Sequence, residues 1–180
     1  HSYSGAFMGE GKDLTDAWMR AIASTGGLVM PMFMPDTTDT GYFAWMRRRN
    51  AAGAEVASRL FGRQVSESEV HYSPWPPELA VEVEAWIAAN PPPPIDIGGI
   101  ADVYDHVRGL VGIDHIGIGS DFDGMGFHPS GWHPELRDVS QLPALLEELR
   151  RRGWSDADLR KLAGENFLRV WREVLAAAEE

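Results

Sequence analysis

Apolar residues recur along this chain with a helical period in several stretches and form short continuous runs in two others. The continuous runs, residues 28–34 and 113–118, predict buried strands. Pro31 weakens the second half of the first run, because proline has no N–H to give to a ladder. The stretches that predict helices cover residues 14–24, 41–61, 78–89, 100–111, 142–149, a segment that starts near 155, and 165–177.

Polar residues at the helix ends support these assignments. Asp13 or Thr15 can cap the first helix, which Gly26 and Gly27 end. Ser140 is placed to cap the helix at 142–149, and Ser155 begins a sequence resembling a capping box. On the last helix we expect the apolar face to be buried, namely Phe167, Val170, Trp171 and Val174.

The order of elements predicts a parallel α/β architecture. Two strands cannot make a stable sheet alone, so further strands must come from elsewhere. Residues 35–95 differ in character: they hold a basic run at 47–49 and four prolines at 91–94, which form a stiff connector. We interpret this block as an insertion between a strand and its returning helix, and the basic run as a solvated helix face rather than a binding patch.

Length and composition bound the function. The 180 residues suit one domain, and the net charge of −11 argues against nucleic acid or an anionic membrane surface as a partner. The absence of cysteine excludes disulfides and thiolate ligands. No apolar run is long enough for a membrane span and no signal peptide is visible, so we expect a cytoplasmic protein. The chain opens on His1, and we expect it to begin inside a larger protein.

The strongest candidate site follows the second apolar run. Residues 119–124 read Gly-Ser-Asp-Phe-Asp-Gly, which places Asp121 and Asp123 between glycines after a predicted strand. Polar residues at the carboxyl end of a barrel strand usually belong to the active site. Asp beside Gly is also ordinary turn chemistry, so these six residues alone leave both interpretations open.

The histidines form no metal-binding motif such as HxH or HExxH. His106 and His115 fit structural roles on a helix and a buried strand. His128 and His133 lie in the loop after Asp121, where substrate contact and a solvated loop are equally good interpretations. A serine nucleophile elbow and a glycine-rich phosphate loop are both missing from the sequence.

Several motifs nevertheless resemble one family. The stretch 111–124 closely resembles the last barrel strand of the membrane (renal) dipeptidase family of zinc peptidases. Segments 100–106, 136–143, 149–154 and 164–170 are similar to that family's neighbouring helices and loops, so the resemblance covers about 100–176. The resemblance implies a (β/α)8 TIM barrel, of which this chain supplies roughly the C-terminal strands and helices.

The same resemblance implies roles for single residues. His1 and Ser2 resemble the end of the sixth strand, whose His binds one of two zinc ions. Lys12 stands where the family has an Arg that grips the substrate carboxylate, and Lys lacks the bidentate fork of Arg. Asp121 matches the catalytic Asp, and His128 is a candidate substrate contact.

The implied activity is hydrolysis of small dipeptides by a water that bridges two zinc ions. The family's other metal ligands precede His1, so the resemblance also implies a complementary N-terminal half, and a homodimer. Two alternatives stay open. One is a same-fold hydrolase with another substrate, such as an acyl-amino acid or a natural-product intermediate, and the other is a non-catalytic homologue or assembly subunit.

Overall fold

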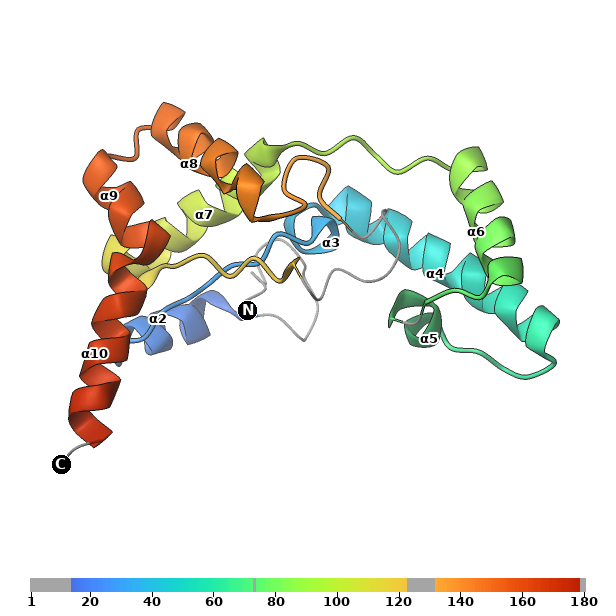
Figure 1. The fold of residues 1–180 in the computed structure, drawn as a ribbon, viewed down its shortest axis with the longest axis horizontal. Coiled ribbons are helices and arrows are strands. Elements are labelled where there is room, and N and C mark those ends of the chain that lie inside the picture. Colours follow the sequence, from blue (N-terminus) through green and yellow to red (C-terminus); the bar gives the residue numbers. More distant parts are fainter. Residues whose placement is uncertain (1–13, 73, 123–131, 179–180) are drawn as a thin grey trace.

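A computed structural model describes residues 14–72, 74–122 and 132–178 of the chain, which are mainly helical (Figure 1). The α-helices are α2 (Asp16–Ser24), α3 (Pro35–Thr38), α4 (Thr40–Phe61), α5 (Glu67–Tyr72), α6 (Pro77–Ala89), α7 (Ile97–Val111), α8 (Leu142–Arg151), α9 (Asp156–Arg160) and α10 (Asn166–Ala178). The described residues also contain two 3₁₀ turns, η1 (Ile113–His115) and η4 (Val139–Gln141), and the π-helical turn η5 (Lys161–Glu165). No helix within these ranges is long and apolar enough to cross a membrane.

The two predicted strands are present as extended segments that pair in parallel, although the described residues contain no regular strand. Val29 donates to His115 O and accepts from Gly117 N, at 2.9 and 3.0 Å, which makes a parallel bridge to Ile116. Further along, Gly119 N donates to Pro31 O at 3.0 Å. The ladder is irregular because Pro31 cannot donate, and because Ile113–His115 turns as a 3₁₀ helix before the extended part begins.

Helix α7 organises the larger core. The apolar periodicity predicts one helix face, of which Ile100, Val103, Tyr104, Val107 and Val111 are buried and Leu110 is partly buried. They pack with Met19 of α2 and Leu145 and Leu149 of α8, and with the two extended segments. The helices thus cover the paired segments and fix their shared edge.

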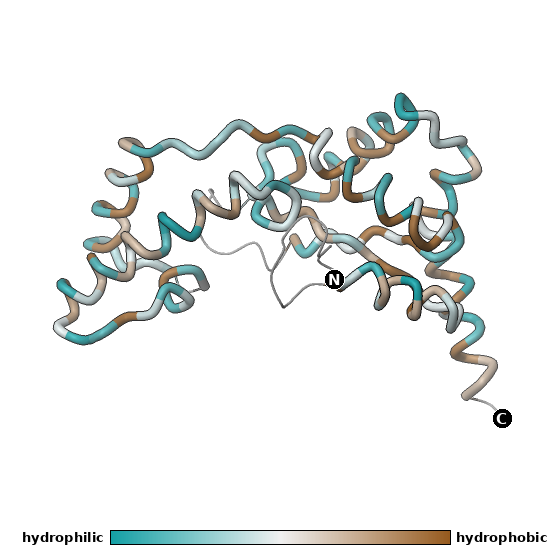
Figure 2. The backbone as a smooth tube through the Cα atoms, turned by 180° about the vertical axis from the view of Figure 1, so that it is seen from behind, coloured by the Kyte–Doolittle hydropathy of each residue, from teal (hydrophilic) through white to brown (hydrophobic). Residues whose placement is uncertain are grey.

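The segment 35–95 forms a second helical group, in which α4 packs on α5 and α6 (Figure 1). Helices α4 and α5 approach closely at Gly53, where a Cβ would lie 2.7 Å from Val70 Cγ1. The prolines at 91–94 lie in an extended stretch that leads back to α7. Figure 2 shows apolar positions on the inward side of these helices as well as around α7.

Arg49 corrects the prediction that residues 47–49 form a solvated face. Arg47 and Arg48 are exposed, whereas Arg49 is 2% exposed. Its guanidinium lies 5.8 Å from the Trp45 ring centre and 5.6 Å from that of Trp75. An arginine side chain can be buried in this way because aromatic faces stabilise its charge.

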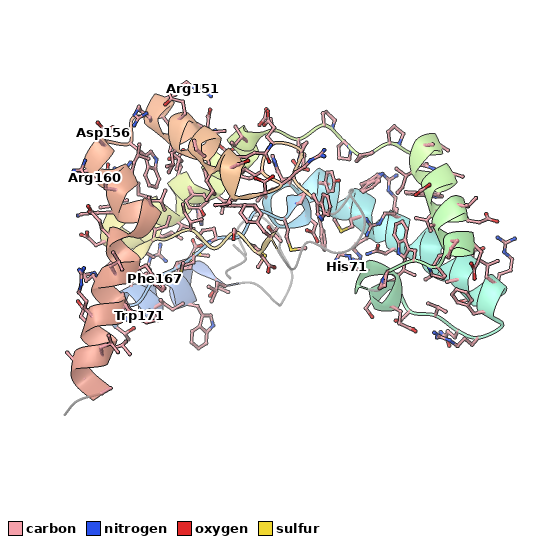
Figure 3. The ribbon with its side chains drawn as sticks, in the orientation of Figure 1. His71, Arg151, Asp156, Arg160, Phe167 and Trp171 are labelled. Atoms are coloured by element: carbon pink, nitrogen blue, oxygen red, sulfur yellow. The ribbon has the colours of Figure 1, made fainter. Side chains whose placement is uncertain are left out.

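The last helix corrects a second prediction. Phe167 and Trp171, labelled in Figure 3, are 44% and 56% exposed, and Val174 is exposed as well. The described residues place no element over this apolar face of α10, so the sequence pattern points to a surface that this part of the chain does not cover.

Two of the three predicted caps are confirmed. The Thr15 side chain accepts from Trp18 N, and Ser155 forms a capping box with Asp158. Ser140 is not a cap, because Asp138 accepts from Ser140 N and begins η4 one turn earlier.

Asn166, at the start of α10, ties that helix to the second extended segment. Its buried amide Nδ2 donates to Ile113 O at 2.6 Å and to Ile116 O at 2.9 Å. Buried carbonyls without a donor destabilise the folded state. These two bonds therefore hold the entry to the segment that carries Asp121.

We expect Asn166→Ala to lower the free energy of unfolding by about 3 kcal/mol, because it leaves two carbonyls without this donor. Urea unfolding measures the change. The exposed Arg172 on the same helix gives the control, Arg172→Ala, with an effect below about 0.5 kcal/mol. Equal effects of the two substitutions would contradict this role of Asn166.

Candidate active site

Asp121 sits at the end of the second extended segment in a left-handed backbone conformation, which is uncommon for residues other than glycine. Ser120 has φ 27° and Asp121 has φ 64°, and these are the described non-glycine residues with positive φ. Such conformations cost of order 1–3 kcal/mol each and cluster at active sites. The surrounding packing must therefore hold Asp121 in place.

Gly119 shows how that packing is achieved. A Cβ at this position would overlap the backbone carbonyl of Met30, so the two segments approach as closely as they do because residue 119 is glycine. One residue later, Ser120 O accepts from Phe33 N at 3.1 Å. The carboxyl ends of both segments thus meet beside Asp121.

Aromatic side chains fill the space beneath this edge. The Phe33 ring lies 5.7 Å from that of Phe122 and 6.3 Å from that of Tyr104. The buried Tyr104 hydroxyl donates to Pro31 O at 3.1 Å, and burial raises the pKa of this phenol far above its usual value. Tyr104 therefore stays neutral and acts as a structural donor under the site.

The other predicted site residues lie outside the described residues. These are His1, Lys12 and His128, together with Asp123, the second carboxylate of the loop. Among the residues with a predicted catalytic, substrate-binding or metal-binding role, the structure therefore describes Asp121 alone. The roles of Asp121, His1, Lys12 and His128 stay predictions.

The described histidines beside the site serve the fold. His106 Nε2 lies 3.1 Å from Asp16 Oδ1, and His115 Nδ1 lies 3.1 Å from Gly27 O, so both have structural partners as predicted. His133 is neither a substrate contact nor part of a solvated loop, because it is 1% exposed. Its Nδ1 accepts from Glu135 N, and its Nε2 lies 3.2 Å from Asp96 O.

The described residues do not by themselves form a metal centre. No group of three or more His, Asp or Glu side chains among them could hold an ion. His1, the ligand that the sequence predicts, lies outside this part. A metal at this edge would need ligands beyond the residues described.

The comparison with protein families decides the relationship. All 180 residues match the model of the membrane dipeptidase family, peptidase family M19. The chain belongs to this family.

The individual relatives of this M19 chain agree. Dipeptidase 3 of Rattus norvegicus is 44% identical over 85 residues, and that of Homo sapiens is 42% identical over 85. Each match covers 47% of this chain and 17% of the relative. The M19 chain thus aligns with less than a fifth of the length of these curated relatives.

A solved structure covers more of the M19 chain. The probable dipeptidase PvdM from Pseudomonas aeruginosa superposes with a TM-score of 0.63 at 27% identity, over 95% of this chain and 43% of that one. Since residues 35–95 are about a third of the chain, most of this helical segment lies within the superposition. A metallopeptidase from Rhodobacter sphaeroides, bound to a phosphinate mimic of L-Ala-D-Ala, shares the fold at 23% identity and a TM-score of 0.55, over 93% of this chain and 33% of that one.

Sequence reasoning missed a second charged cluster in the M19 chain. Asp36 follows the first extended segment as Asp121 follows the second, so the same argument from strand ends could have found it. Its Oδ1 is buried and accepts no hydrogen bond. Burial raises the Asp36 pKa to about 6, although its own backbone N–H and the charge of Arg49 act in the opposite direction.

A chain of hydrogen bonds lies beside Asp36. Arg49 Nε and Nη2 donate to Asn50 Oδ1 at 3.1 and 2.7 Å, which fixes the orientation of that amide. Asn50 Nδ2 then faces His71 Nδ1 at 3.3 Å, so Nδ1 accepts and the imidazole is neutral. Burial, and next the charge of Arg49, lower the His71 pKa, which agrees with the neutral form.

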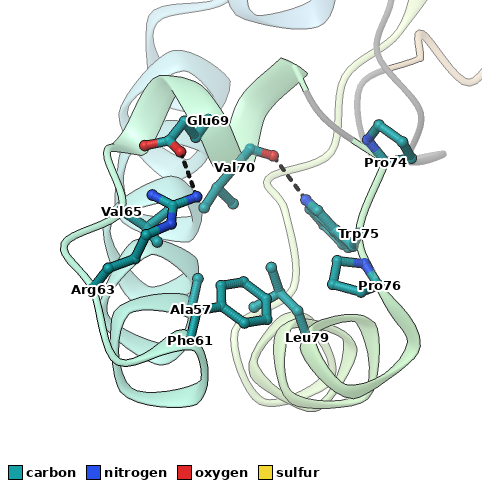
Figure 4. Close-up of a pocket in the computed structure, with 10 residues that line it drawn as sticks. All are labelled: Ala57, Phe61, Arg63, Val65, Glu69, Val70, Pro74, Trp75, Pro76 and Leu79. Carbon is teal, nitrogen blue, oxygen red and sulfur yellow. Dashed lines mark hydrogen bonds and ion pairs between the residues drawn. The ribbon is translucent and has the colours of Figure 1, made fainter.

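A separate apolar cavity of about 90 Å³ lies between α4, α5 and α6 (Figure 4). Trp75 Nε1 donates to Val70 O at 2.7 Å there, and Arg63 pairs with Glu69 at 2.9 Å. Every polar group drawn in this cavity already has a partner within the protein, so it is a packing feature rather than a site.

The raised pKa of Asp36 predicts a pH-dependent loss of stability. A carboxyl whose folded pKa lies near 6 rather than 3.8 stabilises the fold below the lower value, and this contribution is lost as the pH rises through 6. We expect Asp36→Asn to raise the free energy of unfolding by up to about 3 kcal/mol at pH 8, and by much less at pH 4.5.

Urea unfolding at the two pH values measures this difference. Glu55→Gln, which removes an exposed carboxylate from α4, is the control and should change stability little at either pH. Loss of stability at pH 8 in Asp36→Asn would show that the charged form is well stabilised in the fold.

Proposed function

We propose that this chain is part of a metal-dependent dipeptidase that hydrolyses small dipeptides. The observation that carries the proposal is the family match over all 180 residues. The position of Asp121 adds support, because this acid follows the carboxyl end of two paired extended segments, where barrel enzymes carry their active sites.

The architecture that we propose is a (β/α)8 barrel to which this chain contributes the C-terminal strands and helices. The parallel pairing of the two extended segments supports it, and so does the apolar face of α10, which another helix or strand layer would cover. A complementary N-terminal half would supply the remaining strands. We also propose that residues 35–95 are an insertion in this barrel and that the active molecule is a homodimer.

The proposed cofactor is a pair of zinc ions, to which His1 would contribute one ligand and the complementary half the others. Zinc lowers the pKa of bound water and polarises a carbonyl oxygen. Solved relatives described as metallopeptidases support a metal in general.

Asp121 is the proposed general base and acid. Its carboxylate would take a proton from the attacking water and deliver it to the leaving amine. Lys12 would hold the terminal carboxylate of the substrate through its ammonium group, and His128 would contact the substrate from the loop after Asp121. The alternative is a hydrolase of the same fold for an acyl-amino acid or a natural-product intermediate, which Lys12 in place of Arg favours.

The role of Asp121 is tested in the longest natural chain that contains this sequence, loaded with zinc. We expect Asp121→Asn to lower kcat for dipeptides by roughly 10²–10⁴-fold, since the amide cannot transfer the proton. Asp156→Asn on α9, labelled in Figure 3, is the control and should keep kcat. An Asp121→Asn variant that keeps its zinc, its stability and its kcat would remove Asp121 from the mechanism.

The role of Lys12 is tested by two substitutions in the same protein. We expect Lys12→Gln to raise KM for dipeptides about ten- to hundredfold, because it removes a charge-assisted hydrogen bond to the carboxylate. Lys12→Arg should restore or lower KM. Dipeptide hydrolysis found only in Lys12→Arg would instead favour the alternative substrate.

A further inference from the structure

Arg169, in the first turn of α10, is hydrogen-bonded to the amino-terminal ends of both extended segments. Its Nη2 donates to Asp114 O at 2.9 Å, and its Nη1 and Nη2 donate to Gly26 O at 3.3 and 3.2 Å. Asp114 lies at the start of the second segment, and Gly26 lies two residues before the first. One guanidinium therefore bridges the two segments from a helix that belongs to neither.

Neighbouring side chains support this contact. Glu173, one turn further along α10, pairs with Arg169 Nη1 at 3.1 Å. Asn166, about one turn earlier, donates to two carbonyls of the second segment, and Lys161 Nζ pairs with Asp114 Oδ1 at 2.6 Å. Lys161 begins the π-helical turn η5, a kind of turn that often occurs at functional sites. The start of α10 and the turn before it thus hold the beginning of the second segment through several polar side chains.

The sequence of the second segment does not define its register against the first. Residues 116–119 read Ile-Gly-Ile-Gly, so a shift by two positions would place Ile on Ile and Gly on Gly. Gly117 would then take the place of Gly119, where the two backbones approach closely. Register is only weakly specified in such glycine-rich segments. Contacts outside 116–119 therefore have to fix the register of the backbone bonds between the segments.

The bonds of Arg169 are such contacts, because both of its carbonyl acceptors lie outside the Ile-Gly repeat. A shift of the second segment by two residues would move Asp114 O by about 7 Å and break its bond to Arg169. The contact of His115 Nδ1 with Gly27 O, at 3.1 Å, lies at the same ends of the segments. The amino-terminal ends thus discriminate between registers that the repeat does not.

The register in turn decides where Asp121 lies. Asp121 follows the repeat by two residues, and Ser120 O, just before it, accepts from Phe33 N. A shift by two residues would move this end of the segment by about 7 Å as well. A misplacement of about 1 Å at a reacting group can lower a rate about 100-fold. The proposed general base therefore depends on contacts at the opposite ends of the segments.

We propose that Arg169 is a positioning residue for the hydrolysis of dipeptides. By binding Gly26 O and Asp114 O together it sets the register of the two segments, and the register places the Asp121 carboxylate for proton transfer. Glu173 holds the guanidinium in the orientation that reaches both carbonyls. The proposal rests on the proposed dipeptidase function and adds to it a residue that acts on Asp121 through the backbone.

The register is tested by hydrogen exchange in the longest natural chain that contains this sequence. Arg169→Met keeps the methylene stem and removes the donors, and Arg172→Met on the exposed side of the same helix is the control. We expect the amides of Gly117 and Gly119 to exchange at least about tenfold faster in Arg169→Met, because the pairing that protects them loosens. Exchange in α7 should stay unchanged, whereas a merely stabilising role of Arg169 would speed exchange in α7 equally.

Kinetics of the same zinc-loaded proteins test the effect on Asp121. In Arg169→Met we expect kcat for dipeptides to fall at least about tenfold, since the general base is misplaced. KM should stay within about threefold, because the proposed substrate contacts are Lys12 and His128, and Arg172→Met should keep both constants.

The two measurements separate this proposal from the dipeptidase proposal. If the wild-type protein hydrolyses no dipeptide, the dipeptidase proposal fails and hydrogen exchange still decides whether Arg169 sets the register. Unchanged exchange at Gly117 and Gly119, an equal acceleration in α7, or an unchanged kcat in Arg169→Met overturns the positioning role.

Discussion

The close parallel approach of residues 28–33 to residues 116–120 is the constraint on which the rest of the structure depends. It requires glycine at 119, because any Cβ there would overlap the Met30 carbonyl. It also brings the carboxyl ends of both segments to one edge, from which Asp36 and Asp121 emerge. Both segments pack against α7, and Asn166 donates a hydrogen bond to Ile116 O in the second segment. The packing of the helices therefore sets the position of the two acids.

The positive φ of Asp121 and the burial of the Asp36 carboxyl group both lower the stability of the folded state. Each residue stores free energy that a better-adapted residue would release, and natural proteins tolerate such costs mainly at functional sites. At Asp121 the cost lies in the positive φ of the backbone. At Asp36 it lies in the burial of the carboxyl group, which raises its pKa although the charge of Arg49 acts in the opposite direction.

The sequence predicts the longer helices and the position of Asp121 after an extended segment, because both depend on local patterns, whereas the short helices α3 and α5 were missed. Apolar periodicity places α7 and its buried face, and the capping box at Ser155 places α9. The predictions for Arg49 and for the apolar face of α10 are wrong for a different reason. The surroundings of a helix face depend on which distant residues cover it, and Trp75 covers Arg49 from 26 positions away.

Among the described residues, the apolar face of α10 and the outer sides of the paired segments are both surfaces suited to contact with further chain. A helix with Phe167, Trp171 and Val174 exposed is poorly suited to water, and among the described residues no third extended segment pairs with the two. Relatives that are more than twice as long as the matched region have chain enough to cover both.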